Sequence, residues 1–397
     1  MIASEAPQLD MAIVRHRKLA SSATRGRGLK IIHADTDDLG NPLHGGQPVR
    51  TYEVNSRLAE RHDITVLTST YQGAQSRLNR GAVHYRRLGL RVPGLGLSPH
   101  LSFLSRLGPA IRSMPHDLIV EEFTPPLGFC LLPWWTSRPV VSIVQWFMFD
   151  DWERRYHLPF QRMMRVIPRR ARYRRFIVQS ARMADYFREL IPQARVSVIP
   201  CGVNEEMFQQ QPFGDYALYL GRLEHQQKGT DLLLDVWERL CSGGERIPLR
   251  IAGSGPFLEA ARERVHRAGL DDVIHFVGYV SSSLKRQLLR DCRFMVMPSR
   301  SETFGLSALE AMASSKPVIA FDIDHLGELL DSRWALKAPP FSVEAFADAV
   351  AGLWREPDRC LALGERACVQ AQNYRWDAIA RRQEAVYEQV MEEELTS

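Results

Sequence analysis

Short apolar runs alternate with stretches of helical periodicity along the chain from about residue 29 onward. The first run, 29–33, leads into a loop at 34–46, and a β-branched run follows at 64–68. Between the loop and the second run, apolar side chains recur at helical spacing at Val49, Tyr52, Val54 and Leu58. Strand, loop, helix and strand in this order are typical of the βαβ unit that opens a doubly wound parallel sheet.

The alternation restarts about halfway along the chain. Further strands are predicted in the first part at 117–120, 140–144, 176–179 and 196–199. A second series is predicted at 217–220, 249–252, 274–277, 294–297 and 317–321, and a long helical pattern covers 376–394. Two series favour an α/β fold with two Rossmann-like halves over one very large sheet. Residues 1–27 are polar and basic without a period, so we expect a flexible leader there.

Composition places the chain among ordinary folded proteins. Of its 397 residues, 45% are hydrophobic and 24% charged, which disfavours the disordered, fibrous and coiled-coil classes. No apolar stretch approaches the roughly 18 residues of a membrane-spanning helix, and no secretory signal follows the basic start. We therefore expect a cytoplasmic protein. The six cysteines are scattered without a CxxC pair, which favours reduced thiols over disulfides or a zinc site.

The net charge of +5 conceals an asymmetry between the two halves. Residues 1–200 carry 29 Lys and Arg against 16 Asp and Glu, a net charge of +13, whereas residues 201–397 carry 22 against 30, a net charge of −8. A basic half indicates an anionic partner, such as a phosphorylated substrate, a phospholipid surface or nucleic acid. The charge alone does not distinguish these three partners, so the choice among them depends on the motifs.

Two glycine-containing loops could approach a ligand. Gly45 and Gly46 lie between the first strand and the first helix, where backbone N–H groups and the positive helix end can accept phosphate. Gly253 follows the strand at 249–252. Each loop has a second interpretation, a plain tight turn. The sequence has neither a GxGxxG fingerprint nor a Walker lysine at the first loop, which excludes a dinucleotide or P-loop motif there.

Two cations follow the strand at 217–220. Gly221 and Arg222 end that strand, and Lys228 comes six residues after Arg222, before a helix that Thr230 or Asp231 could cap. An arginine can bind a diphosphate with two donors while a lysine acts as a point charge. The alternative interpretation is a pair of solvated surface charges.

The segment 297–312 is the richest in candidate chemistry. A strand stops at Pro298, Thr303 can cap, and a helix is predicted over about 305–314, with Glu302 before it and Glu310 within it. Backbone amides of Phe304, Gly305 and Leu306 would then point at a ligand. Carboxylates accept hydrogen bonds from hydroxyl groups, so Glu302 could hold sugar hydroxyls and Glu310 ribose hydroxyls. The alternatives are a helix-end charge and a surface carboxylate; a glycosidase pair is disfavoured because both come from one short segment.

The segment 297–312 resembles the signature of a known family. Glu302 and Glu310, with seven residues between them, look like the E-x7-E signature of retaining glycosyltransferases of family 4. Further matching segments follow one another in the family's order along residues 29–397: HGGQPVRTYEVNSRLAERHDITVLTS, VIPCGVNEEMF, LYLGRLEHQQKGTDLLL, LRIAGSGP, VIHFVGYV and PSRSETFGLSALEAMASSKPVIA. Their order and spacing make the resemblance very specific.

The resemblance implies a GT-B fold, in which two Rossmann-like, doubly wound domains face a cleft. It implies an N-terminal acceptor-side domain over 28–200, a C-terminal nucleotide-sugar domain over 201–375, and a helix at 376–397 that returns to the N-domain. The donor would be a UDP- or GDP-hexose, the acceptor a glycan or a lipid-linked sugar, and the activity that of a hexosyltransferase. Such enzymes retain configuration and generally use no metal and no further cofactor.

The resemblance also assigns roles to individual residues. Arg222 and Lys228 would neutralise the donor diphosphate, and Gly46 would approach it from the facing domain. Glu302 and the backbone of Phe304, Gly305 and Leu306 would hold the transferred sugar, and Glu310 the ribose. In the usual mechanism of the family the acceptor attacks from the front face and a diphosphate oxygen takes its proton. The Arg and Lys charges and the helix end supply the electrophile.

The sequence departs from the family after the strand at 140–144. Many relatives place a His there, whereas this chain has Gln145, Trp146 and, slightly later, Asp150. Gln145 or Asp150 could take over a contact with the sugar, and Trp146 could stack on an acceptor; packing in the fold is the alternative for the aromatic side chains.

An arginine-rich segment runs from Arg154 to Arg175. Between residues 151 and 175 lie nine arginines against two acids, interleaved with apolar residues, and Pro159 and Pro168 are expected to limit any helix to about two turns. Such a segment could lie on an anionic membrane surface on the inner face of the membrane; a solvated face is the alternative. Nucleic acid is disfavoured because no recognised binding module accompanies the charge.

Two other functions compete with transfer. One is a nucleotide-sugar epimerase with the same fold, which release of sugar without an acceptor would reveal. The other is a membrane-docking scaffold with an inactive site, against which Arg222, Lys228, Glu302 and Glu310 argue because all four are present.

Overall fold

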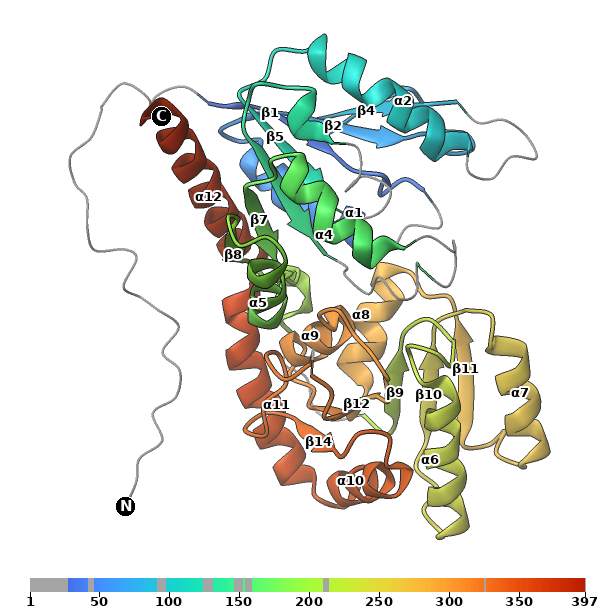
Figure 1. Ribbon diagram of the computed structural model, residues 1–397. Coiled ribbons are helices and arrows are strands. Elements are labelled where there is room, and N and C mark those ends of the chain that lie inside the picture. The colour runs from blue at the N-terminus through green and yellow to red at the C-terminus, as the bar shows by residue number, and fades with distance from the viewer. Residues whose placement is uncertain are drawn as a thin grey trace, which may run out of the picture.

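The computed structural model describes residues 28–41, 46–90, 98–123, 131–145, 153, 159–209, 214–324 and 326–396. The expected leader at 1–27 and the candidate residues Gly45, Trp146, Asp150 and Arg154 lie outside the described residues. The described chain forms two sheets of mainly parallel strands, each flanked by helices, one above the other in Figure 1. This is the expected fold class, two doubly wound α/β units.

The first sheet has eight strands in the order β3-β4-β2-β1-β5-β6-β7-β8, and all neighbours pair in parallel except β3 with β4. Its strands are β1 Lys30–Ala34, β2 Asp63–Ser69, β3 Arg77–Arg80, β4 Val83–Leu88, β5 Leu118–Glu122, β6 Val140–Val144, β7 Arg175–Val178 and β8 Arg195–Val198. Its helices are α1 Gln47–Leu58, α2 Ser98–Arg112, α4 Phe160–Arg170 and α5 Ala181–Leu190, with a 3-10 turn η3 at Leu132–Trp134.

Alternation of side chains along the strands places helices on both faces of this sheet. On one face, Ile31, Ile64 and other strand residues form a core with Val54 of α1. On the other face, Ile32 and its neighbours form a core with Phe103 of α2. The central strands β1, β5, β6 and β7 are buried on both sides, which is why they read as apolar runs in the sequence.

The second sheet has six parallel strands in the order β11-β10-β9-β12-β13-β14. Its strands are β9 Ala217–Leu220, β10 Leu249–Ala252, β11 Ile274–Gly278, β12 Phe294–Met297, β13 Val318–Phe321 and β14 Leu336–Ala338. The remaining elements of this half are η4 Glu205–Met207, α6 Thr230–Ser242, α7 Leu258–Arg267, α8 Ser282–Asp291, α9 Leu306–Ala313, α10 Val343–Arg355, α11 Pro357–Ala371 and η5 Gln372–Tyr374.

The last helix, α12 Trp376–Thr396, runs from the second half of the structure along the first (Figure 1). The guanidinium of Arg50 on α1 donates to Gln383 Oε1 at 2.8 Å, and the ring of His62 lies 2.8 Å from Glu384 Oε1. Trp376 packs against Gly202 in the segment between the two sheets, where an added Cβ would come within 2.4 Å of the indole. The C-terminal helix therefore holds the first half through both apolar and polar contacts.

A second contact joins the halves at α5. The amide groups of Ala181 and Arg182 donate to the carboxylate of Glu328, at 2.9 and 3.2 Å, and Arg182 pairs with Asp324. Glu328 and Asp324 belong to the segment after β13, so a carboxylate from the second half caps a helix of the first.

Across the described ranges, no helix has the length and apolar character needed to cross a membrane.

Candidate active site

The candidate residues gather at the points where the strand order of each sheet reverses. In the second sheet β9 and β12 are neighbours, but the chain proceeds from β9 to β10 on one side and from β12 to β13 on the other. Ligands of doubly wound sheets bind at the carboxyl ends of the strands at such switch points. The loop after β9 carries Arg222 and Lys228, and the loop after β12 carries Glu302. The corresponding point of the first sheet lies at β1 and β5.

The two loops of the second sheet meet in a charge pair. Lys228 Nζ donates to Glu302 Oε1 at 2.6 Å, and the Ser299 hydroxyl donates to the same oxygen at 2.8 Å. The Glu302 side chain is 8% exposed and that of Lys228 26%. A carboxylate this buried is stabilised by an ammonium and a hydroxyl donor. Sequence reasoning named both residues as donor contacts; the structure brings them into direct contact with each other.

Arg300 holds the lysine loop against the glutamate loop. Its guanidinium makes two hydrogen bonds of 2.7 Å to the carboxylate of Asp231, and its amide donates to the carbonyl of Gln227 at 2.7 Å. Burial alone would raise the pKa of Asp231, but the hydrogen bonds and charge of Arg300 hold that pKa below its usual value. Sequence reasoning missed Arg300, although it lies inside the richest motif. Its partner Asp231 lies in the first turn of α6, whose N-cap is Gly229.

The caps proposed from the sequence are wrong at both helices. Gly229 in the left-handed conformation is the N-cap of α6, and the hydroxyl of Thr230 instead bonds back to the carbonyl of Glu224 at 3.1 Å. Gly305, with a φ of +88°, is the N-cap of α9, so Thr303 does not cap it. In both cases glycine supplies a backbone conformation that a Ser or Thr cap does not.

Arg222 stands apart from the Lys228–Glu302 pair. Its side chain is 59% exposed, donates to Gln227 Oε1 at 3.2 Å and lies 3.6 Å from Glu224 Oε1. An exposed guanidinium remains available to a ligand. Gly221 and Gly253 directly follow the adjacent strands β9 and β10, and a Cβ on Gly253 would stand 1.9 Å from the carbonyl oxygen of Gly221. Close strand packing therefore requires a glycine at Gly253, whether or not a ligand approaches.

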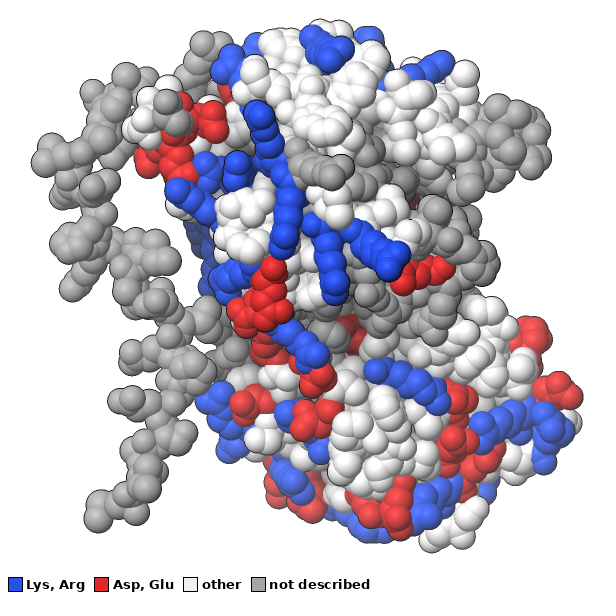
Figure 2. Space-filling model, in the orientation of Figure 1, with Lys and Arg blue, Asp and Glu red and all other residues white. Residues whose placement is uncertain are grey.

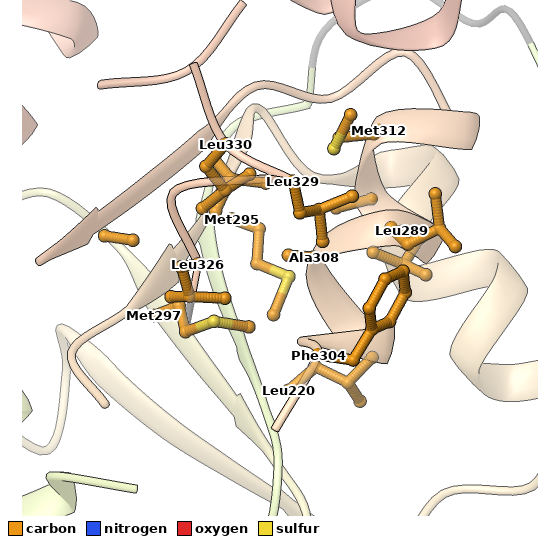
Figure 3. Close-up of a cluster of buried hydrophobic side chains, with 14 of the residues drawn as sticks. Leu220, Leu289, Met295, Met297, Phe304, Ala308, Met312, Leu326, Leu329 and Leu330 are labelled. Atoms are coloured by element: carbon orange, nitrogen blue, oxygen red, sulfur yellow. The ribbon is translucent and has the colours of Figure 1, made fainter. Parts of the chain in front are cut away.

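The start of α9 offers backbone hydrogen-bond donors beside the Lys228–Glu302 pair. A helix leaves its first amide groups without an intrahelical partner, so the amides after Gly305 can bind an anion or a polar oxygen. The side chain of Phe304 points away into the core formed with Leu326, Leu329 and Met297 (Figure 3). Only the backbone of Phe304 is thus available to a ligand. That core fixes the position of the helix start.

The first half reaches the same place through Gly46. A Cβ on Gly46 would come within 3.0 Å of Leu306 Cδ1, so the start of α1 lies against the start of α9. Gly46 has an exposed position and is the N-cap of α1 without a side-chain hydrogen bond. Gly46 and Leu306, predicted as donor contacts from opposite domains, are neighbours in the structure.

Gln145 is occupied within the first half. It follows β6, is buried, and donates from Nε2 to Glu122 Oε2 at 2.7 Å, while Gln179 donates to its Oε1 at 3.5 Å. Its predicted contact with a sugar would require these partners to be exchanged. The other two candidates of this loop, Trp146 and Asp150, lie outside the described residues.

Sequence reasoning missed a buried polar cluster at the switch point of the first sheet. Asp35, directly after β1, accepts from Thr51 Oγ1 and Gln47 Nε2 at 2.7 Å each, and His33 Nε2 lies 3.3 Å from Glu122 Oε1. Burial, reinforced by the charge of Glu122, raises the pKa of Asp35 to about 7. Asp35 therefore anchors the first turn of α1, which begins next to Gly46. Single polar residues at strand ends gave no signal of this cluster in the sequence.

The buried Glu121 on β5 is expected to make the stability of the fold depend on pH. Burial raises its pKa from 4.5 to about 8, and the hydrogen bond from Ser142 only partly opposes the shift. The folded state then binds more protons than the unfolded state between these values, so the free energy of unfolding falls as pH rises from about 4.5 to about 8. Glu121→Gln should reduce the fall in denaturant midpoint between pH 5 and pH 8. An undiminished fall in the variant would contradict this assignment.

Comparison with known families places each half of the chain. Residues 44–207 match the model described as Glycosyltransferase Family 4, and residues 214–356 match the model described as Glycosyl transferases group 1. The two matches together cover about three quarters of the chain. They meet in the segment that joins the two sheets.

Individual relatives are similar over about half of their length. The chain is 30% identical over 204 residues to a phosphatidyl-myo-inositol mannosyltransferase of Mycobacterium leprae, covering 48% of this chain and 53% of that protein. It is 29% identical over 189 residues to the O-antigen chain mannosyltransferase C of Escherichia coli, covering 44% and 49%. The matched region thus spans about half the length of these curated relatives.

Solved structures share the fold over nearly the whole chain. A sucrose-phosphate synthase from Thermosynechococcus elongatus superposes with a TM-score of 0.73 at 21% identity, covering 91% of this chain and 99% of that one. HepE of Anabaena in complex with UDP and glucose superposes with a TM-score of 0.71 at 17% identity, with the same coverage. At such identities the likeness concerns the fold.

Proposed function

Because the chain belongs to glycosyltransferase family 4 and has the GT-B fold, we propose that it is a retaining hexosyltransferase. The donor is a UDP- or GDP-hexose, and the acceptor is a hydroxyl of a glycan or a lipid-linked sugar in polysaccharide, glycolipid or glycoconjugate synthesis. Support for this comes from relatives named as mannosyltransferases for phosphatidyl-myo-inositol and for an O-antigen chain, and from a HepE structure that holds UDP and glucose.

The observation that carries the proposal is the Lys228–Glu302 pair beside the start of α9. Departure of a nucleoside diphosphate leaves negative charge on the phosphate oxygens, which preorganised cations and amide groups stabilise. Lys228, the exposed Arg222 and the amides after Gly305 serve that purpose in the proposal, so no metal ion is required. Glu302 holds a hydroxyl of the sugar, and the leaving diphosphate takes the proton of the acceptor.

A nucleotide panel tests the donor site directly. UDP, GDP, ADP, TDP and their common sugar conjugates are added to the purified protein, and the unfolding temperature is measured. A ligand at 100 times its dissociation constant adds about 2.7 kcal/mol to the free energy of unfolding. We expect a shift from one base family only, persisting in the presence of a metal chelator.

The control for the panel is Arg222→Ala. The side chain is exposed and its hydrogen bond is to Gln227, so its loss leaves the fold intact. The shift should decrease in this variant. Absence of a shift with every nucleotide would argue against the proposed donor site, and loss of the shift on adding chelator would argue against metal-free binding.

The acceptor side is proposed to dock on an anionic membrane surface through α4. This helix spans eleven residues and continues past the buried Pro168, so the expectation of about two turns is wrong. Its described side chains that face solvent are Arg162, Arg165, Val166 and Arg169. Figure 2 shows the Lys and Arg side chains gathered on this face of the upper half, whereas both signs mix over the lower half.

Vesicle binding tests this surface. Each exposed cation near an anionic bilayer contributes about 1 kcal/mol, so the double variant Arg162→Glu and Arg165→Glu should bind vesicles containing phosphatidylserine at least about tenfold more weakly. Binding is measured by co-sedimentation at low and high salt. The matched control is the double variant Arg239→Glu and Arg355→Glu, which reverses the charge of two exposed arginines in the second half. Equal binding by both double variants would contradict the proposed surface.

A further inference from the structure

Glu310, the predicted ribose contact, has a partner that the sequence motifs do not include. Lys285 on α8 forms an ion pair with Glu310 Oε1 on α9. The side chains are 25% and 18% exposed, so the pair is neither deeply buried nor freely solvated. In the part of the chain that the structure describes, the second carboxylate oxygen of Glu310 has no hydrogen bond. One oxygen is therefore held, and the other is available to a ligand.

Packing of α8 against α9 fixes the origin of the lysine. Leu288 and Leu289 lie three and four positions after Lys285, on the same face of α8, and both are buried. Leu289 lies in the same apolar cluster as Phe304, Ala308 and Met312, under the start of α9 (Figure 3). The buried leucines thus set the position from which the ammonium reaches the carboxylate.

We propose that Lys285 is a positioning residue for the donor and a determinant of ribose over 2′-deoxyribose recognition. It holds the Glu310 carboxylate in the orientation in which the free oxygen accepts hydrogen bonds from the hydroxyl groups of the ribose. The proposal rests on the proposed function, since it requires a nucleotide at this site. It adds a residue on a different helix from the motif that carries Glu310.

The physical reason is preorganisation. A glutamate side chain that becomes ordered only on binding loses its rotamer freedom in the binding step. A lysine that already orders the carboxylate removes much of this cost from the binding step. Sites built to bind a hydroxyl discriminate strongly against an analogue that lacks it, because the polar group of the site is then left without its partner. Lys285 sharpens that discrimination by keeping Glu310 in place.

The test compares ribonucleotides with their 2′-deoxy counterparts. Dissociation constants are measured by titration calorimetry for UDP, 2′-deoxy-UDP, GDP and 2′-deoxy-GDP on the wild-type chain, Lys285→Met and Glu310→Gln. We expect the wild type to prefer the ribose form of its nucleotide by about tenfold or more. Both variants should lose most of this preference, through weaker binding of the ribose form alone. The double variant should lose no more than Glu310→Gln does.

Lys337→Met is the matched control. Lys337 pairs with Asp322 at 2.8 Å and is also 25% exposed, but it lies on β14 at the edge of the sheet. This variant should keep the preference. If Lys285→Met keeps it too, or weakens both nucleotide forms equally, the positioning role is overturned while the donor site stands. If Glu310→Gln also keeps the preference, the ribose role of Glu310 fails, and the role of Lys285 fails with it. If no nucleotide binds, the proposed function fails.

Discussion

Replacing Lys228 by alanine is expected to lower kcat/KM by about tenfold or more, the scale of losing one well-placed electrostatic contact. The substitution removes the cation that faces Glu302 and leaves that carboxylate, which is 8% exposed, with the hydroxyl of Ser299 as its remaining donor. Glu302→Ala should cause a loss of similar size because it removes the contact to the sugar and the partner of Lys228. Rates are measured with the nucleotide-sugar that the panel identifies.

The control for these variants is Lys337→Ala. It removes a lysine of nearly equal exposure from a lysine–carboxylate pair, two strands away from β12. We expect its rate to stay near that of the wild type. Because Lys228 and Glu302 act on each other, the double variant should lose less than the product of the two single losses. Wild-type rates in both single variants would remove these residues from the proposed site.

Local patterns were sufficient to predict the strands that are buried on both faces. Every strand expected in the two series is present within two residues at either end, because apolar runs of four to seven residues between loops have few alternatives. The hairpin of β3 and β4 was missed: β3 reads RLNR and β4 VHYRRL, and neither has the apolar run that marks a parallel central strand. β3 lies at the edge of the sheet and β4 pairs with both β3 and β2, so pairing rather than their own pattern stabilises these strands.

The candidate site likewise has residues that the sequence predicts and residues that it does not. The motif residues Arg222, Lys228, Glu302 and Glu310 could be chosen from one linear sequence because they lie in loops after predicted strands or, for Glu310, in the helix that follows such a loop. The ion pair of Lys285 with Glu310 and that of Arg300 with Asp231 could not be predicted, since they depend on how loops and helices far apart in the sequence pack. The buried cluster of Asp35 and Glu122 was invisible for the same reason, because 87 residues separate the two carboxylates.

Gly229 constrains the backbone where the loop of Lys228 meets the loop of Glu302. Gly229 has a φ of +61° and starts α6 directly after Lys228, and an added Cβ would stand 2.0 Å from the carbonyl oxygen of Pro298. A backbone atom cannot rotate away as a side chain can. Gly229→Ala must therefore separate the loop of Lys228 from the loop of Glu302, and we expect lower stability together with weaker nucleotide binding.

Gly244→Ala isolates the collision from the strain of the left-handed conformation. Gly244 has a φ of +88° just after α6, with no atom within 4 Å of an added Cβ. A left-handed alanine costs about 1–2 kcal/mol, which both variants share, whereas overpacking adds about 1–3 kcal/mol in Gly229→Ala alone. Denaturant unfolding should show this difference, and only Gly229→Ala should weaken the nucleotide shift. Equal stability and equal nucleotide binding in the two variants would mean that the loops of Lys228 and Glu302 separate without cost, and that their 2.6 Å contact is not needed to bind the donor.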